Sequence, residues 1–196
     1  KIARKLILNG ADIVTDTNMA LAGINKKVLA SFGGEAYCYM ADEEVAKLAK
    51  ERAGENRPNA LFIPTASHDY MPYYNTFHKV YTGLFNIKTD VALTVFKEPD
   101  MEKMRSKFEK ADVIYVGGGD TVFMIEEWKK SGMLELIKAA YERGVIIAGL
   151  SAGAICWFTD IYTDSAAALG VGDKYAMFKG LGWIEGKISP HYGSRM

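Results

Sequence analysis

The sequence has few cysteines, no excess of charge of either sign and no long apolar run. Its 2 cysteines, Cys38 and Cys156, are too few for a disulfide framework and suit a reducing compartment. The 24 lysines and arginines equal the 24 aspartates and glutamates, which argues against a broad footprint for nucleic acid or anionic lipid. No apolar run approaches the roughly 18 residues that a membrane span needs. We therefore expect a cytoplasmic protein with neither a nucleic-acid nor a membrane partner.

The rest of the composition is that of an ordinary globular domain. Hydrophobic residues make up 49% and charged residues 24% of the 196 positions, without an internal repeat or a low-complexity tract. A chain of this length favours one domain whose core needs neither metal nor disulfides. We expect a single domain over residues 1–196, with an N-terminal segment of unassigned role at 1–26 and the main body at 27–196.

Short apolar runs alternate with longer segments of helical periodicity. The runs that we expect as strands are 27–32, 59–64, 91–96, 111–116, 145–150 and 183–188. The segments that we expect as helices are 41–52, 70–85, 101–110, 121–130, 134–143 and 151–158. Strands that are apolar on both faces and alternate with helices predict an α/β fold, a three-layer α/β/α architecture with a mostly parallel sheet. In such a sheet, ligands bind beyond the carboxyl ends of the strands.

The motif that carries chemistry is G-x-S-x-G at Gly149–Gly153, between an expected strand and an expected helix. This context is typical of a nucleophile elbow, in which a sharp turn projects the serine hydroxyl above the edge of the sheet. The following helix offers unpaired backbone N–H groups to a developing oxyanion. We therefore predict Ser151 as the nucleophile and the N–H of Ala152 as the first oxyanion donor. The alternative is a tight turn of small residues without a catalytic role.

A serine nucleophile needs a base and usually an acid that orients the base. Of three histidines, His78 lies in an apolar periodic helix, which favours a structural role, and His68 lies in a loop at the correct edge of the sheet. His191 follows an expected strand and a proline that keeps the backbone extended, and we favour it. Asp160 and Asp164 both lie between Ser151 and His191 in the sequence. We predict Asp164 as the orienting acid, with Asp160 as the close alternative.

A second glycine-rich segment, Gly117–Thr121, ends another expected strand. As part of the same site, Gly118 or Gly119 would supply the second oxyanion donor. A phosphate cradle is one alternative, since the segment partly resembles the G-G-D-G-T loop of NAD and lipid kinases. It lacks the glycine after Asp120, however, and no Walker lysine follows. A loop that only needs positive φ angles is the other alternative.

Five blocks, in order along the chain, resemble the peptidase E family. They are FIPTAS at 62–67, YVGGGDT at 115–121, GLSAGAICWF at 149–158, GLG at 180–182 and PHY at 190–192. The resemblance covers about residues 27–195, and five ordered blocks make it specific. It implies the flavodoxin-like scaffold of class I glutamine amidotransferases and a relation to the cyanophycinases.

The resemblance also implies an activity, that of a cytoplasmic serine dipeptidase that cleaves after an N-terminal aspartate without a metal or another cofactor. Ser151 would be the nucleophile, His191 the base, and the N–H groups near Gly118 and Ala152 the oxyanion hole. A substrate aspartyl group calls for a cationic partner, and Arg195, close to His191 in the sequence, is our candidate. The partner would be a small peptide substrate. The oligomeric state stays open, with a homodimer as one alternative.

The chain departs from the family pattern in two places. Some relatives carry a glutamate directly after the Trp-Phe pair, where this chain has Thr159, which leaves the acid open between Asp164 and Asp160. Relatives also continue well past the histidine, whereas this chain ends five residues after His191. We therefore expect either a C-terminal truncation or a different completion of the sheet. This motivates a second hypothesis, a non-catalytic or weakly active relative that binds a ligand, and a third, a nucleotide-binding domain that uses the Gly117–Thr121 loop.

Overall fold

The computed structural model describes residues 8–9, 13–15, 26–33, 36–38, 43–96, 99–165 and 175–189. The chain divides into two compact units, Lys1–Glu44 and Val45–Met196. In the smaller unit, β1 (Ile13–Thr15) pairs in parallel with β2 (Ala36–Cys38), and α3 spans Lys26–Ser31. The expectation of a single domain with its main body from residue 27 stays a prediction.

The larger unit is built on a four-stranded parallel sheet with the strand order β4-β3-β5-β6. Its strands are β3 (Asn59–Ile63), β4 (Lys88–Val91), β5 (Val113–Val116) and β6 (Ile146–Gly149). All four residues of β5 are buried, as expected of a central strand that is covered on both faces. The predicted strands at 59–64, 111–116 and 145–150 are therefore confirmed.

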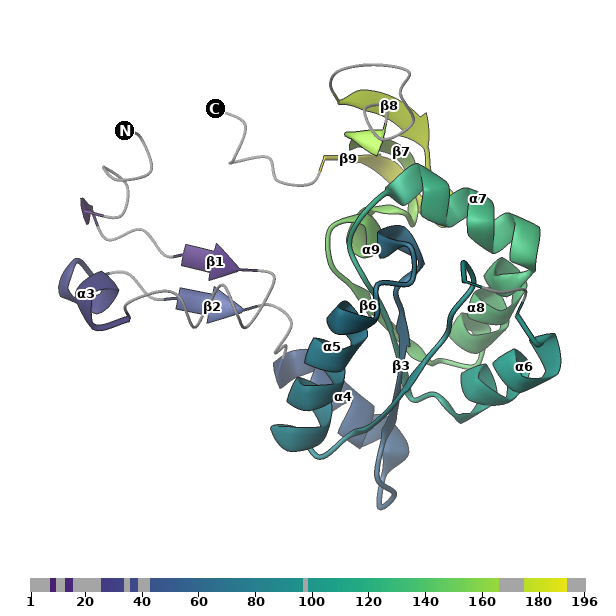
Figure 1. Ribbon diagram of the computed structural model, residues 1–196, viewed down its shortest axis with the longest axis horizontal. Helices are drawn as coiled ribbons and strands as arrows, with labels where there is room; N and C mark the ends of the chain where they lie inside the picture. Colours follow the sequence, from purple (N-terminus) through teal and green to yellow (C-terminus); the bar gives the residue numbers. More distant parts are fainter. Residues whose placement is uncertain are drawn as a thin grey trace. The chain divides into compact units, whose positions relative to one another are not determined.

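Helices cover both faces of this sheet (Figure 1), which confirms the predicted three-layer α/β fold with a mostly parallel sheet. On one face lie α4 (Glu43–Ala53) and α5 (Met71–Gly83). On the other face lie α6 (Met101–Lys110), α7 (Thr121–Ser131) and α8 (Met133–Glu142). Each of these five helices was expected from its periodicity. No helix within the described ranges is both long and apolar enough to cross a membrane.

Alternate residues of the central strands form the core on opposite faces, as the two-residue period of a strand requires. Phe62 and Tyr115 face α5, where the ring of Phe77 lies 4.8 Å from that of Phe62 and 5.3 Å from that of Tyr115. The intervening residues of the same strands are buried against α6, α7 and α8 in one cluster. Its members include Leu61, Ile63, Met104, Phe108, Ile114, Val116, Met124, Trp128 and Ile137. Full burial of such side chains stabilises the fold by about 1.5–3 kcal/mol each.

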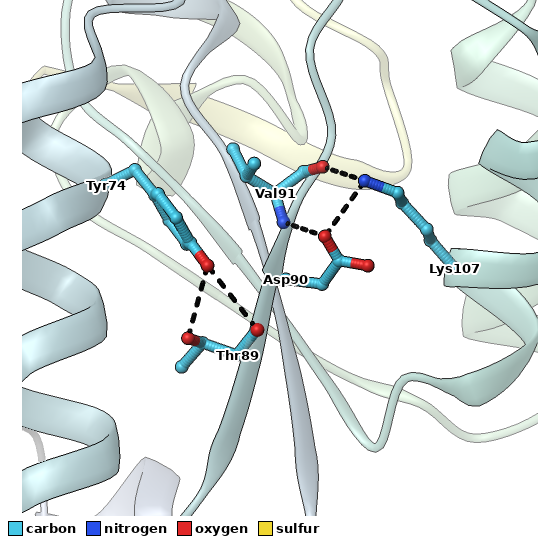
Figure 2. A network of polar contacts seen from close by, with 5 residues as sticks. All are labelled: Tyr74, Thr89, Asp90, Val91 and Lys107. Carbon is cyan, nitrogen blue, oxygen red and sulfur yellow. Dashed lines mark hydrogen bonds and ion pairs between the residues drawn. The ribbon is translucent and has the colours of Figure 1, made fainter.

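Polar contacts tie the edge strand β4 to the helices on both faces (Figure 2). The hydroxyl of Tyr74, on α5, lies 3.3 Å from the hydroxyl of Thr89. The ammonium group of Lys107, on α6, lies 2.9 Å from the Asp90 carboxylate and donates to the carbonyl of Val91 at 2.7 Å. The outermost strand is thereby held from both sides.

A three-stranded sheet with the order β8-β7-β9 follows the parallel sheet in the chain. It consists of β7 (Phe158–Thr163), β8 (Ala176–Lys179) and β9 (Ile184–Ile188), with β8 antiparallel and β9 parallel to β7. The predicted strand at 183–188 is confirmed, whereas β7 and β8 were not predicted.

The helix expected at 151–158 is too long, because α9 spans only Ala152–Ile155. The carbonyls of the next two residues bond to a distant segment. The carbonyl of Cys156 accepts from the N–H of Leu181 at 2.8 Å, and that of Trp157 from the N–H of Ile184 at 2.9 Å. These bonds start the extended course of β7, so the helix ends after one turn.

The strand expected at 27–32 is also wrong, since these residues lie in α3 and in the turn after it. The hydroxyl of Ser31 donates to the carbonyl of Val28, one helical turn earlier, at 2.7 Å. Leu29 is the only residue of 27–33 that is buried. A strand covered on both faces would bury most of the run, so the apolar composition alone was misleading.

The strand expected at 91–96 begins and ends too late, because β4 spans Lys88–Val91. Beyond β4, the N–H groups of Thr94 and Val95 donate to Oδ2 of Asp69, at 2.8 and 2.6 Å. A buried carboxylate thus takes the donors that a longer strand would have used, and the chain leaves the sheet.

Candidate active site

The turn after β6 holds Ser151 in a backbone conformation that L residues rarely adopt. Its φ of 51° and ψ of −111° lie outside the α, β and left-handed helical regions. Such a conformation costs about 1–3 kcal/mol and persists only where the surrounding structure imposes it. The strand β6 ends at Gly149, and α9 begins at Ala152, directly after Ser151. Leu150 and Ser151 therefore form the turn between them. The strand–turn–helix context that G-x-S-x-G predicts is therefore present.

Both glycines of the motif are required by the close packing of this turn. A Cβ atom on Gly149 would lie 2.3 Å from the carbonyl oxygen of Gly153. A Cβ atom on Gly153 would lie 2.2 Å from the carbonyl oxygen of Val116, at the end of β5. Only residues without a side chain fit at these two places. The spacing of the motif thus follows from the contact between α9 and the strand next to β6.

The second glycine-rich segment lies directly against Ser151. A Cβ atom on Gly118 would be 3.3 Å from the Cβ of Ser151 and 3.3 Å from the carbonyl oxygen of Leu150. Gly119, with a φ of 141°, lies so close to Ala66 that a Cβ there would be 2.1 Å from its carbonyl oxygen. Two motifs that are about 30 residues apart in the chain therefore meet at the carboxyl ends of β5 and β6. This is the edge at which parallel sheets bind their ligands.

The backbone N–H groups around Ser151 differ in whether they are already bonded. The N–H of Gly118 donates to the hydroxyl of Tyr73 at 3.2 Å. In the part of the chain that the structure describes, the N–H groups of Gly119 and Ala152 have no acceptor. Because α9 has one turn, its macrodipole adds little, and the individual N–H groups are what this edge offers to an anion.

Tyr73 and Asp69 belong to this edge of the sheet and were not found from the sequence. The ring of Tyr73 stands edge-on to Phe62, with 5.1 Å between the centroids, and would be 3.0 Å from a Cβ on Gly117. Asp69, in the loop after β3, is fully buried and holds the backbone beyond β4. Segment 70–85 is rich in aromatic residues, so its local pattern did not distinguish Tyr73 from Tyr74.

Of the two candidate acids, Asp160 is engaged in an ion pair. It lies on β7 opposite Lys179 of β8, whose ammonium nitrogen is 2.6 Å from Oδ1 of Asp160. This hydrogen bond lowers the pKa of Asp160 below the ordinary value of an aspartate. The Asp160 carboxylate is therefore already bonded to Lys179 on the adjacent strand.

Asp164, the preferred acid, is exposed and directly follows β7. The hydroxyl of Thr163 lies 3.4 Å from its Oδ1. The hydroxyl of the next residue, Ser165, accepts from the N–H of Val122 at 3.3 Å. The end of β7 is thereby held against the start of α7, directly after the Gly117–Thr121 loop.

The three histidines lie in different surroundings. On α5, Nδ1 of His78 lies 2.6 Å from the hydroxyl of Thr89, a contact that supports the structural role expected for it. His68 follows the single turn η1 (Thr65–Ser67) with a φ of 52°, and its exposed ring lies 4.0 Å from the ring of Phe123. His191, the predicted base, and Arg195, the predicted substrate contact, lie outside the described residues.

Asp120, in the glycine-rich loop, caps α7. Its Oδ1 accepts from the N–H groups of Val122 and Phe123, both at 3.1 Å. The N–H of Val122 also lies 3.3 Å from the Ser165 hydroxyl. The N–H groups of Val122 and Phe123 at this helix start are therefore occupied by groups of the chain itself.

Several known proteins that resemble this chain are peptidases. The family model of peptidase family S51 matches residues 28–196. The uncharacterized peptidase YgaJ of Bacillus subtilis is 34% identical over 167 residues, which cover 85% of this chain and 69% of YgaJ. A peptidase E of Shewanella oneidensis is 28% identical over 134 residues, 68% of this chain and 53% of that protein. The crystal structure of a peptidase from an acI-B1 actinobacterium shares the fold, with a TM-score of 0.63 at 20% identity over 80% of this chain and 64% of that one.

Proposed function

Because the chain belongs to peptidase family S51, we propose that it hydrolyses short peptides with Ser151 as the nucleophile. The observation that carries the proposal is the backbone of Ser151, held at a φ of 51° between a buried strand and a helix turn. Strain of this kind collects at functional sites, and an elbow presents its serine above the edge of the sheet. The contact with Gly118 adds a second backbone segment to the same place.

The proposed mechanism is acyl transfer. His191 accepts the proton of Ser151 as the hydroxyl oxygen attacks the peptide carbonyl, and the tetrahedral oxyanion is stabilised by backbone N–H groups of Ala152 and of the Gly118–Gly119 segment. Each such donor contributes about 3 kcal/mol in comparable sites. The protonated histidine then donates to the leaving amine, and water hydrolyses the acyl-enzyme. The role of His191 rests on the family resemblance.

We propose Asp164 as the acid that orients His191. The ion pair of Asp160 with Lys179 supports this choice, since a carboxylate bonded at 2.6 Å would have to leave its partner to contact the histidine. The contact of Ser165 with the start of α7 also keeps the neighbour of Asp164 close to the glycine-rich loop.

For the substrate, we propose dipeptides with an N-terminal aspartate, in the cytoplasm, with Arg195 as the partner of the aspartyl carboxylate. A guanidinium group suits this role because it binds a carboxylate through two parallel hydrogen bonds. The support for these details is the resemblance to the peptidase E family.

The core of the proposal is tested with a fluorophosphonate, which labels activated serines, together with the hydrolysis of aspartyl dipeptides. We expect stoichiometric labelling at Ser151 in the wild type and no labelling or turnover in Ser151→Ala. The matched control is Ser131→Ala, because the Ser131 hydroxyl bonds to the Glu127 carbonyl at the far end of α7. Undiminished labelling and turnover in Ser151→Ala would contradict the proposal, and an unlabelled, folded wild type would favour the ligand-binding hypothesis.

The nucleotide-binding alternative has less support. A phosphate cradle would use the first N–H groups of α7, and Asp120 places a carboxylate on them at 3.1 Å. A phosphate there would meet like charge instead of unpaired donors. A rise in melting temperature with ATP, measured against buffer alone, would revive this alternative.

A further inference from the structure

We propose that Tyr73 is a positioning residue of the oxyanion hole, an inference that rests on the proposed function. Its hydroxyl accepts the N–H of Gly118 at 3.2 Å and so holds the glycine-rich loop in one orientation. The N–H of Gly119 then serves the oxyanion together with that of Ala152, and the N–H of Gly118 does not.

The pattern of bonds along the loop supports this assignment. The N–H of Gly117 donates to the carbonyl of Ile63 at 3.0 Å, and that of Asp120 to the carbonyl of Ala66 at 2.8 Å. With Gly118 bonded to Tyr73, three of four consecutive N–H groups have acceptors. Within the described part of the chain, the N–H of Gly119 is the one that has none. Gly119 is exposed, whereas Gly117 is buried and Gly118 half-buried, so a ligand at this edge of the sheet can reach the loop at Gly119.

The ring of Tyr73 is fixed by its packing, so its hydroxyl stays at the Gly118 N–H. It packs edge-on against Phe62, which is itself fully buried and stacked on Phe77 at 4.8 Å. Its Cε1 lies where a Cβ on Gly117 would come within 3.0 Å, so the ring touches the backbone of the loop. The hydroxyl therefore fixes the peptide between Gly117 and Gly118 from a rigid base.

A glycine-rich loop needs such a restraint, since glycine has the largest conformational freedom of all residues. Gly118 also lies against Ser151, so a shift of the loop moves the oxyanion donors relative to the nucleophile. A misplacement of about 1 Å at a reacting centre lowers the rate by about 100-fold. Loss of the hydroxyl should leave substrate binding intact, so kcat should fall while KM stays nearly constant.

The test compares Tyr73→Phe with the matched control Tyr74→Phe. Tyr74 is the next residue of α5, and its hydroxyl contacts Thr89 on the edge strand β4 (Figure 2). In the sheet, β3 and β5 stand between β4 and β6, the strand that precedes Ser151. Both variants keep the aromatic ring and lose only a hydroxyl. In Tyr73→Phe we expect kcat for an aspartyl dipeptide, and the rate of fluorophosphonate labelling, to fall about 10- to 100-fold. In Tyr74→Phe both should remain within about twofold of the wild type, because nothing near the oxyanion changes.

A measurement that does not depend on turnover accompanies the kinetics. Amide hydrogen exchange at Gly118 should become faster in Tyr73→Phe than in the wild type and Tyr74→Phe, since the N–H loses its acceptor. Equal kinetics and equal Gly118 exchange in the two variants would overturn the role of Tyr73 while the wild type still reacts at Ser151. A wild type that neither labels nor hydrolyses would overturn the proposed function and this inference together. A rise in KM without a change in kcat would also refute the positioning role.

Discussion

Replacement of Gly153 by alanine should damage both the stability and the reactivity of the chain. The new Cβ atom would lie 2.2 Å from the carbonyl oxygen of Val116 and 2.7 Å from its Cβ. Separations under 3.0 Å essentially never occur for real Cβ atoms, so α9 and β5 must move apart by about 0.8 Å. Neither obstacle is the end of a flexible side chain that could turn away.

Two opposing effects decide the size of the change. Alanine is a better helix former than glycine, which alone would stabilise the variant by about 1 kcal/mol. Overpacking of a tight contact costs about 1–3 kcal/mol or more, and here the contact is with backbone. We expect the steric effect to prevail, with a net loss of about 1–2 kcal/mol and a melting temperature lowered by about 2–8 °C for a chain of this size.

The same displacement should reach Ser151, two residues earlier in the same turn. A movement approaching 1 Å would lower the rate of fluorophosphonate labelling by about 100-fold. The control is Gly83→Ala, at the end of α5, where a Cβ would have nothing within 4 Å. This control should unfold at the same or a slightly higher urea concentration and label like the wild type. If Gly153→Ala matches Gly83→Ala in both assays, the close packing inferred for the turn is wrong.

Two further predictions concern ionisable groups. The pKa of Asp160 is lowered by its hydrogen bond to Lys179, so its contribution to stability is present at neutral pH and is lost as the pH falls through that lowered value. Asp160→Asn should therefore unfold at a lower urea concentration than the wild type at pH 7. The difference should vanish in acid well below about pH 4, the ordinary range of the aspartate pKa. An equal difference at both pH values would contradict this. Burial raises the pKa of the Cys156 thiol far above its ordinary value, so Cys156 should resist iodoacetamide at pH 8 in the native protein and react in urea, as peptide mapping would show. Rapid alkylation of Cys156 in the native state would refute the burial.

The parallel sheet and its helices were predictable because their signals are local and repeated. The runs at 59–63, 113–116 and 146–149 are apolar on both faces, and the helices between them show a clear amphipathic period. Patterns among neighbouring residues were enough to find these three strands and the helices between them. Topology followed, since strands joined by helices pair in parallel.

Two elements have ends that were misjudged because contacts between distant parts of the chain determine them. The helix after Ser151 ends early because Leu181 and Ile184 bond to the carbonyls of Cys156 and Trp157. The strand β4 ends at Val91, before the expected end at residue 96, because the N–H groups of Thr94 and Val95 donate to Asp69. Asp69 lies some 25 residues earlier in the chain. Neither partner is visible in a local window of sequence.

The candidate site also combines features that local sequence predicts with features that depend on distant residues. The conformation of Ser151 and the need for Gly149 and Gly153 follow from a motif of five residues, so the sequence was sufficient for them. The meeting of Gly118 with Ser151 needed only the order of adjacent strands.

Which N–H groups of the loop are unoccupied depends instead on Tyr73, 45 residues before Gly118. Tyr73 is one of several tyrosines in α5, and nothing in its local sequence indicates that contact. Local sequence patterns therefore could not decide between Gly118 and Gly119 as the oxyanion donor; in our proposal the bond from Gly118 to the Tyr73 hydroxyl favours Gly119. A glycine-rich loop supplies more donors than an oxyanion needs, and the residues that occupy the surplus donors determine where the anion binds.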